Sequence, residues 1–255
     1  GEACVGVEGA TAGGEWGDMG GSGEGGGRGG RGGLGRVDLG GPREPQELLD
    51  EGELARASGR YGRAAGLLDE ALASDPQNAA MLEESVSILE RLEDPKRLAD
   101  RLAQLGALRA AGGQHAAAIE PLEKAIFNTP DHVESLSVLR DCFAALNDSE
   151  KAADISLRLA RTHTSAEDDP GALEVCRIGI AISPDSATLR FHYAQILART
   201  GNETFAQSEL RELIERTTEQ KAAVRTRRAR DLLTACYSLL LRIDADDDQA
   251  REGLR

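Results

Sequence analysis

The four histidines are the side chains best suited to acid–base or metal chemistry, and they are scattered. They are His115, His132, His163 and His192. Neighbouring members are at least 17 residues apart, and none belongs to a metalloprotease, serine-hydrolase, phosphate-loop or cysteine–histidine motif. His163 lies in the segment THTS, where we expect it to cap the carboxyl end of a helix. His192 lies in RFHYAQ, either as a half-exposed helix residue or as one that faces a ligand groove.

The four cysteines show no pairing that would indicate metal or redox chemistry. They are Cys4, Cys142, Cys176 and Cys236. None is in a CxxC pair, and no histidine cluster lies at metal-ligand spacing, so we expect small buried apolar side chains. The sequence therefore predicts a protein that is not an enzyme, with no catalytic residues, no bound metal and no cofactor.

Two charged runs near the carboxyl end have alternative interpretations. The run 244–248 resembles the start of a calcium loop, but Gln249 stands where the sharp turn requires glycine, so we interpret it as a polar turn. The run 221–230 is basic. It is either a solvated helix face paired with nearby acids or a docking patch for an acidic segment or a phosphate. The candidate patch residues are Lys221, Arg225 and Arg228.

Composition favours packed helices and protein partners. The net charge is −14 and aromatic residues make up only 3% of the 255 residues. An acidic chain does not attract nucleic acid at long range, so we expect basic or neutral partners and no nucleic acid. Since no apolar run reaches the length of a membrane span, we also expect no membrane insertion and a cytoplasmic location.

Glycine is concentrated at one end of the chain. Residues 1–41 hold 19 of the 30 glycines, and glycine loses the most backbone entropy when it is ordered. The sequence therefore predicts a disordered arm or linker over 1–41 and a folded domain over 42–255.

An internal repeat is the strongest pattern in that second part. Gly52, Gly106 and Ala160 each begin the same steps: a small residue 12 and 19 positions later and a proline 24 positions later. Small residues allow helices to approach closely, glycine or asparagine turns end the first helix, and proline ends the second. The copies predict helices at 46–58, 61–74, 79–92, 95–111, 115–128, 132–146, 149–165, 170–183, 186–200, 203–216, 220–242 and 247–254.

The segment 45–78 resembles the tetratricopeptide repeat, a helix–turn–helix unit of about 34 residues. The match consists of Gly52, the turn at 59–61, Ala64, Leu68, Ala71 and the pair Asp75-Pro76. The copies at 99–132, 153–186 and 187–216 are less regular. The early tryptophan of the family is replaced in all four segments, by Leu48, Leu102, Ser156 and Arg190. The resemblance implies an all-α, right-handed α-solenoid of about six helical hairpins that binds proteins.

In that family, a groove lined mainly by the first helix of each pair binds an extended peptide or a partner helix. By this resemblance the candidate groove residues are Asp50, Glu53, Glu134, Asp141, Arg158, Arg161, His192, Gln195 and Arg199. They change from acidic to basic along the chain, which predicts one orientation for a bipolar peptide. The alternative is a regulatory module of a larger bacterial signalling, secretion or motility protein, with 1–41 as the linker between domains.

Overall fold

The computed structural model describes residues 43–219 and 226–255. Within these ranges the chain forms helices and no strand, as an all-α solenoid. The predicted arm at 1–41 lies outside the described residues, so its disorder and the domain boundary stay predictions. Lys221 and Arg225 of the predicted basic patch also lie outside them.

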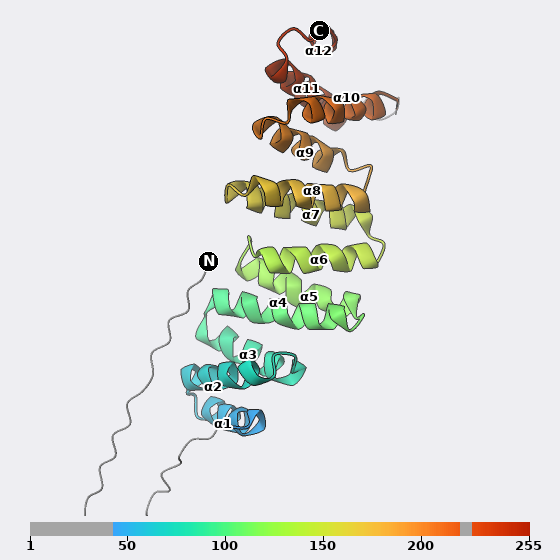
Figure 1. The fold of residues 1–255 in the computed structure, drawn as a ribbon. Coiled ribbons are helices and arrows are strands. Elements are labelled where there is room, and N and C mark those ends of the chain that lie inside the picture. Colours follow the sequence, from blue (N-terminus) through green and yellow to red (C-terminus); the bar gives the residue numbers. More distant parts are fainter. Residues whose placement is uncertain (1–42, 220–225) are drawn as a thin grey trace, which may run out of the picture. The chain divides into compact units, whose positions relative to one another are not determined.

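The helices follow one another in chain order from α1 to α12 (Figure 1). Their bounds are α1 (Pro45–Ala57), α2 (Tyr61–Ser74), α3 (Ala79–Leu92), α4 (Pro95–Ala111), α5 (His115–Asn128), α6 (Val133–Ala145), α7 (Ser149–Ser165), α8 (Asp169–Ile182), α9 (Ala187–Arg199), α10 (Glu203–Glu219), α11 (Arg227–Ile243) and α12 (Asp248–Gly253).

The turns show that the repeating unit is three helices long. Residues with left-handed backbone fall into two series with a spacing of 54 positions. One series ends the first helix of each unit, and the other ends the third. The first series is Gly59, Gly113 and Glu167, and the second is Glu93, Asn147 and Gly201.

Helix packing follows the same three-helix period. Besides its neighbours in sequence, α4 contacts α6, and the equivalent helix α7 contacts α9. The small-residue signature therefore falls on the pairs α1–α2, α4–α5 and α7–α8, and a single helix follows each pair. A tetratricopeptide unit has two helices, whereas the signature recurs every three. The first helix of a signature pair is therefore odd-numbered in one copy and even-numbered in the next: α1, α4 and α7.

The small residues lie at close helix crossings, as the spacing predicts. Gly52 and Gly106 are buried, and Ala118 and Ala160 are fully buried. A β-carbon at Gly106 would lie 2.5 Å from the Leu122 Cγ atom. Leucine, isoleucine and alanine side chains fill the space between the helices and form a series of apolar clusters along the stack. This is expected for repeats that bury surface mainly against their neighbours.

Two predicted helix boundaries differ from the structure by more than one residue. The sequence ends one helix at 216, whereas α10 continues to Glu219. It places the next helix at 220–242, whereas α11 begins at Arg227 and Thr226 is its N-cap. The Thr226 hydroxyl accepts a hydrogen bond from the Ala229 backbone N–H at 3.2 Å, which satisfies a donor that has no partner within the helix. The helix-forming composition of 220–225 carries no signal for a start at Thr226.

Candidate partner-binding surface

Four cavities are bordered by odd-numbered helices, and they define what we call the odd-helix face, formed by α3, α5, α7, α9 and α11. Each cavity is bordered by at least two of these helices. The even-numbered helices contribute much of the floor, with buried side chains such as Leu98 of α4, Leu139 of α6 and Leu213 of α10. The hollows of this face are therefore a consequence of the helix stacking.

The cavity named here the His192 cavity has a volume of about 410 Å³. His192, Gln195 and Arg199 of α9 lie on one side of their helix, because residues three, four and seven positions apart share a face. Helices α7, α10 and α11 supply the other walls. Its lining is Thr164, His192, Gln195, Ile196, Ala198, Arg199, Glu203, Leu239, Arg242 and Ile243.

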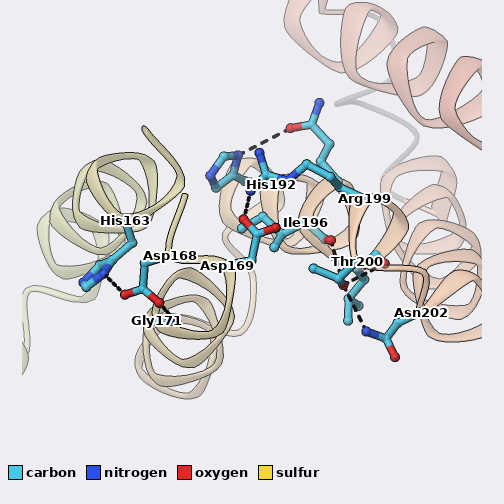
Figure 2. Close-up of polar contacts among 11 residues, drawn as sticks. His163, Asp168, Asp169, Gly171, His192, Ile196, Arg199, Thr200 and Asn202 are labelled. Carbon is cyan, nitrogen blue, oxygen red and sulfur yellow. Dashed lines mark hydrogen bonds and ion pairs between the residues drawn. The ribbon is translucent and has the colours of Figure 1, made fainter. Parts of the chain in front are cut away.

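Two polar atoms of this cavity are buried and unpartnered. The His192 Nε2 atom and the Thr164 Oγ1 atom have no hydrogen-bond partner among the described residues. The other ring nitrogen of His192 lies 3.4 Å from the Gln195 side-chain oxygen (Figure 2). Burial lowers the pKa of His192, the Gln195 hydrogen bond opposes that shift, and the positive charges of Arg161 and Arg199 add to it. His192 is therefore neutral at neutral pH.

Three arginines lie in or near the cavity, and they differ in whether they form an ion pair. Arg199 pairs with Asp169 at the start of α8 (Figure 2). Arg161 and Arg242 are exposed and form no hydrogen bond or ion pair with any described residue. Glu203 is the opposing acid in the lining. Of the two arginines without a described partner, Arg242 lines the cavity, and Arg161 lies near enough to His192 to act on its pKa.

The remaining predicted groove residues lie apart from this cavity. Arg158 of α7 donates a hydrogen bond to the Pro130 carbonyl oxygen at 2.7 Å and lines a different cavity, beside Phe127. Asp50 and Glu53 are exposed on α1.

Glu134 and Asp141 lie on α6, an even-numbered helix, and line none of the four cavities. Asp141 pairs with Arg140 at 2.7 Å. The structure therefore brings together His192, Gln195 and Arg199, with Arg161 close enough to act on the pKa of His192.

The predicted basic patch is represented by Arg228 alone among the described residues. Arg228 is exposed and lines a cavity of about 640 Å³ together with Arg190 and Arg216. Arg190 is buried and already satisfied, because it donates to the Pro184 carbonyl oxygen at 2.7 Å and pairs with Glu209 at 3.1 Å. Arg216 pairs with Glu212 at 2.8 Å, so of the three arginines that line this cavity Arg228 alone forms no ion pair with a described residue. The docking patch stays a prediction.

Two of the other histidines, His132 and His163, join neighbouring helices, whereas the His115 Nδ1 atom is buried without a partner among the described residues. The His163 Nδ1 atom lies 2.7 Å from the Asp168 carboxylate, which also accepts the Gly171 backbone N–H at 3.0 Å (Figure 2). That N–H and His163 lower the pKa of Asp168. His163 lies in the last turn of α7, as predicted, and in addition joins it to the N-cap of α8. His132 is the N-cap of α6 and lies 3.0 Å from Asp100.

The cysteines and the acidic run also have structural roles. Cys142, Cys176 and Cys236 are buried free thiols, as predicted, and Cys4 lies outside the described residues. The acidic run is a turn that ends in Asp247, the N-cap of α12, which pairs with Arg211 at 3.0 Å. No described group of three or more metal-ligating side chains is arranged to hold an ion.

Phe127 is the feature that the sequence interpretation missed. Its side chain on α5 is 87% exposed, and it lines two cavities. A signal was present, because the residues 54 positions before and after it, Ala73 and Ala181, are both alanine.

Comparison with known proteins assigns one segment to a family. A family model described as tetratricopeptide repeat matches residues 49–100, which span the helices from α1 into α4. This segment is a tetratricopeptide repeat. Such repeats generally mediate protein–protein interaction, and proteins built from them are typically non-enzymatic scaffolds. No curated protein sequence matches significantly. Among the described helices, none is long and apolar enough to cross a membrane.

Solved structures of other repeat proteins are similar at low identity. A Podosopora anserina putative kinesin light chain with nearly identical TPR-like repeats is 17% identical, with a TM-score of 0.39, over 83% of this chain and 93% of that one. YrrB, a TPR protein with an unusual peptide-binding site, is 19% identical, with a TM-score of 0.24, over 56% and 88%. MamA from Desulfovibrio magneticus RS-1 is 14% identical, with a TM-score of 0.28, over 69% and 96%. These values are too low to transfer a partner.

Proposed function

We propose that this tetratricopeptide repeat chain is a scaffold that binds a segment of another protein along the odd-helix face. The observation that carries the proposal is the pair of buried, unpartnered atoms, His192 Nε2 and Thr164 Oγ1, in one cavity. A buried polar atom without a hydrogen bond costs about 1–3 kcal/mol. A polar group of a partner that enters this cavity removes that cost, so the free energy favours occupation.

Charge favours an acidic group as the occupant. Arg242 lines the cavity and has no described partner, so a carboxylate in the cavity would form charge-assisted hydrogen bonds with it, and the charge of Arg161 near His192 adds to the attraction. In the neutral ring the His192 Nδ1 atom donates to the Gln195 oxygen and Nε2 is an acceptor, so Nε2 becomes a further donor to a carboxylate only when His192 is protonated. Glu203 opposes this preference and restricts the carboxylate to the side of the cavity nearer the arginines.

The distribution of charge along the stack supports one orientation of the bound segment. Exposed acids, Asp50 and Glu53, lie on α1, whereas Arg161 and Arg199 lie near the other end, on α7 and α9. A segment that is acidic at one end and basic at the other meets opposite charges in one direction and like charges in the reverse direction. Electrostatic complementarity of this kind selects orientation and speeds association.

The test begins with a display library of random twelve-residue peptides selected on the immobilised full chain. We expect enriched peptides to carry a cluster of acidic residues near one end. Their dissociation constants are then measured by fluorescence anisotropy with the wild type and with Arg161→Glu/Arg242→Glu. The double variant should bind at least tenfold more weakly.

A matched control separates this effect from a general change of charge. Arg60→Glu alters an exposed arginine that also has no described partner and lines none of the four cavities. The control should bind as the wild type does. Equal affinity of the double variant and the wild type would rule out the His192 cavity as a binding site.

A further inference from the structure

Phe127 separates two apolar cavities on the odd-helix face. The first, between α3, α4 and α5, has a volume of about 510 Å³ and is lined by Leu89, Leu98 and Leu102 among others. The second, between α5, α6 and α7, has a volume of about 570 Å³ and includes Ile126, Leu139, Phe143 and Ile155. We call them the first and second Phe127 cavities.

The exposure of Phe127 has no structural explanation within its own repeat. Ala73 and Ala181 stand at the equivalent positions of the flanking copies, so the helix packing does not require a large side chain there. Exposing an aromatic ring to water is unfavourable. Aromatic side chains flanked by apolar pockets are typical anchors of protein interfaces, because they bury a large area with little loss of conformational freedom.

The other exposed phenylalanine provides a contrast. Phe205 is 67% exposed on α10 and lines none of the four cavities. Phe127 alone of the two is continuous with apolar surface on both sides. Exposure of a phenylalanine ring alone does not therefore place it between two cavities; of the two exposed rings, only Phe127, on the odd-helix face, has this position.

The rim of the first Phe127 cavity is acidic. Glu90 and Glu93 are exposed and form no ion pair with any described residue. Lys124 also lines the cavity; it pairs with Glu120 at 2.9 Å, and its charge also interacts with that of Glu90. Because neither Glu90 nor Glu93 forms an ion pair with a described residue, the edge of this apolar hollow attracts a further basic side chain.

We propose that the surface around Phe127 binds a peptide segment with two large apolar side chains, one in each Phe127 cavity, and a lysine or arginine against Glu90 and Glu93. The proposal rests on the proposed function and specifies the partner. The basic end lies toward α3, and the acidic end lies toward the His192 cavity between α7 and α11. Phe127 packs between the two apolar side chains and fixes the segment along the stack.

The test uses the peptides selected on the wild-type full chain and three further proteins. We expect the enriched sequences to contain a pair of large apolar residues with a basic residue on the side away from the acidic cluster. Phe127→Ala should weaken binding at least tenfold, and Phe205→Ala should leave it within twofold. Glu90→Lys/Glu93→Lys should weaken binding of the same peptides and restore it for versions in which the basic residue is replaced by glutamate.

The outcomes distinguish this inference from the broader proposal. If Phe127→Ala binds as tightly as Phe205→Ala while Arg161→Glu/Arg242→Glu loses affinity, the scaffold function stands and the Phe127 site is refuted. Enriched peptides without an apolar pair would refute it as well. Because Phe127 is almost fully exposed, its truncation should leave the thermal midpoint unchanged, and the circular dichroism melt of each variant verifies that the fold is intact.

Discussion

Gly106 lies directly against Leu122: a β-carbon on Gly106 would be 2.5 Å from the Leu122 Cγ atom and 2.6 Å from one of its methyl groups. The crossing of α4 and α5 therefore depends on the missing side chain. We expect Gly106→Ala to lower the free energy of unfolding by about 1–3 kcal/mol, because overpacking forces the leucine or the helices to move. Urea denaturation followed by circular dichroism measures the change.

A second glycine provides the matched control. Gly66 lies in the middle of α2, and a β-carbon there would meet nothing within 4 Å. Gly66→Ala should raise the free energy of unfolding by about 0.5–1 kcal/mol, because alanine loses less backbone entropy in a helix. Equal effects of the two substitutions would show that the α4–α5 crossing is not as close as described.

The 54-residue series of left-handed turns predicts stabilising substitutions. Glu93 and Glu167 have φ values of 53° and 60°, whereas glycine stands at several equivalent positions, including Gly201 and Gly113. Glu93→Gly and Glu167→Gly should each raise the free energy of unfolding by about 1 kcal/mol, since glycine adopts this conformation without strain. Glu70→Gly, in the middle of α2, should instead lower it by about 1 kcal/mol. Destabilisation at Glu93 or Glu167 would contradict the three-helix period.

The buried thiols should be unreactive in the folded protein. Burial raises the pKa of both Cys176 and Cys236 to about 12, and burial also raises the pKa of Cys142. The thiolate is the reactive form. In a Cys4→Ser variant at pH 8, Ellman's reagent should therefore detect no thiol in minutes, and three after addition of guanidinium. Rapid reaction of the native variant would contradict the described core.

His192 should make the stability depend on pH. Its pKa is lowered in the fold, so as the pH falls through about 6.5 the unfolded chain takes up a proton before the folded chain does. The free energy of unfolding should therefore decrease through this group as the solution becomes more acidic, with no contribution at pH 8. Chemical denaturation of the wild type and His192→Gln between pH 8 and pH 5 measures the difference. Parallel curves would show that His192 titrates alike in both states.

The helices could be predicted closely from the sequence because their ends are local. The helix end before Pro76 depends on proline geometry, and those at Gly59 and Gly201 depend on left-handed backbone, each of which is evident in a few residues. The main exception is α11, whose start depends on the single hydroxyl of Thr226 in a segment otherwise rich in helix formers.

The candidate surface overlaps the predicted groove only in part, because the cavities depend on which helices border them across the stack. Glu134 and Asp141 lie on α6, an even-numbered helix that contributes to a cavity floor, and they line none of the four cavities. His192, Gln195 and Arg199 share one helix face, so their convergence follows from spacing alone. The two cavities beside Phe127 could not be predicted from the sequence, because α3 borders one of them and α7 borders the other.

Photo-crosslinking with a peptide selected on the wild-type chain tests the odd-helix face most directly. A benzophenone amino acid replaces one exposed residue at a time. On odd-numbered helices these are Glu123 on α5 and Asp154 on α7, which line the second Phe127 cavity and have no assigned contact with the peptide, and on even-numbered helices they are Glu70 on α2 and Glu174 on α8. We expect peptide adducts at Glu123 and Asp154 and none above background at Glu70 and Glu174. Adducts confined to Glu70 and Glu174 would place the partner on the opposite set of helices and contradict the account.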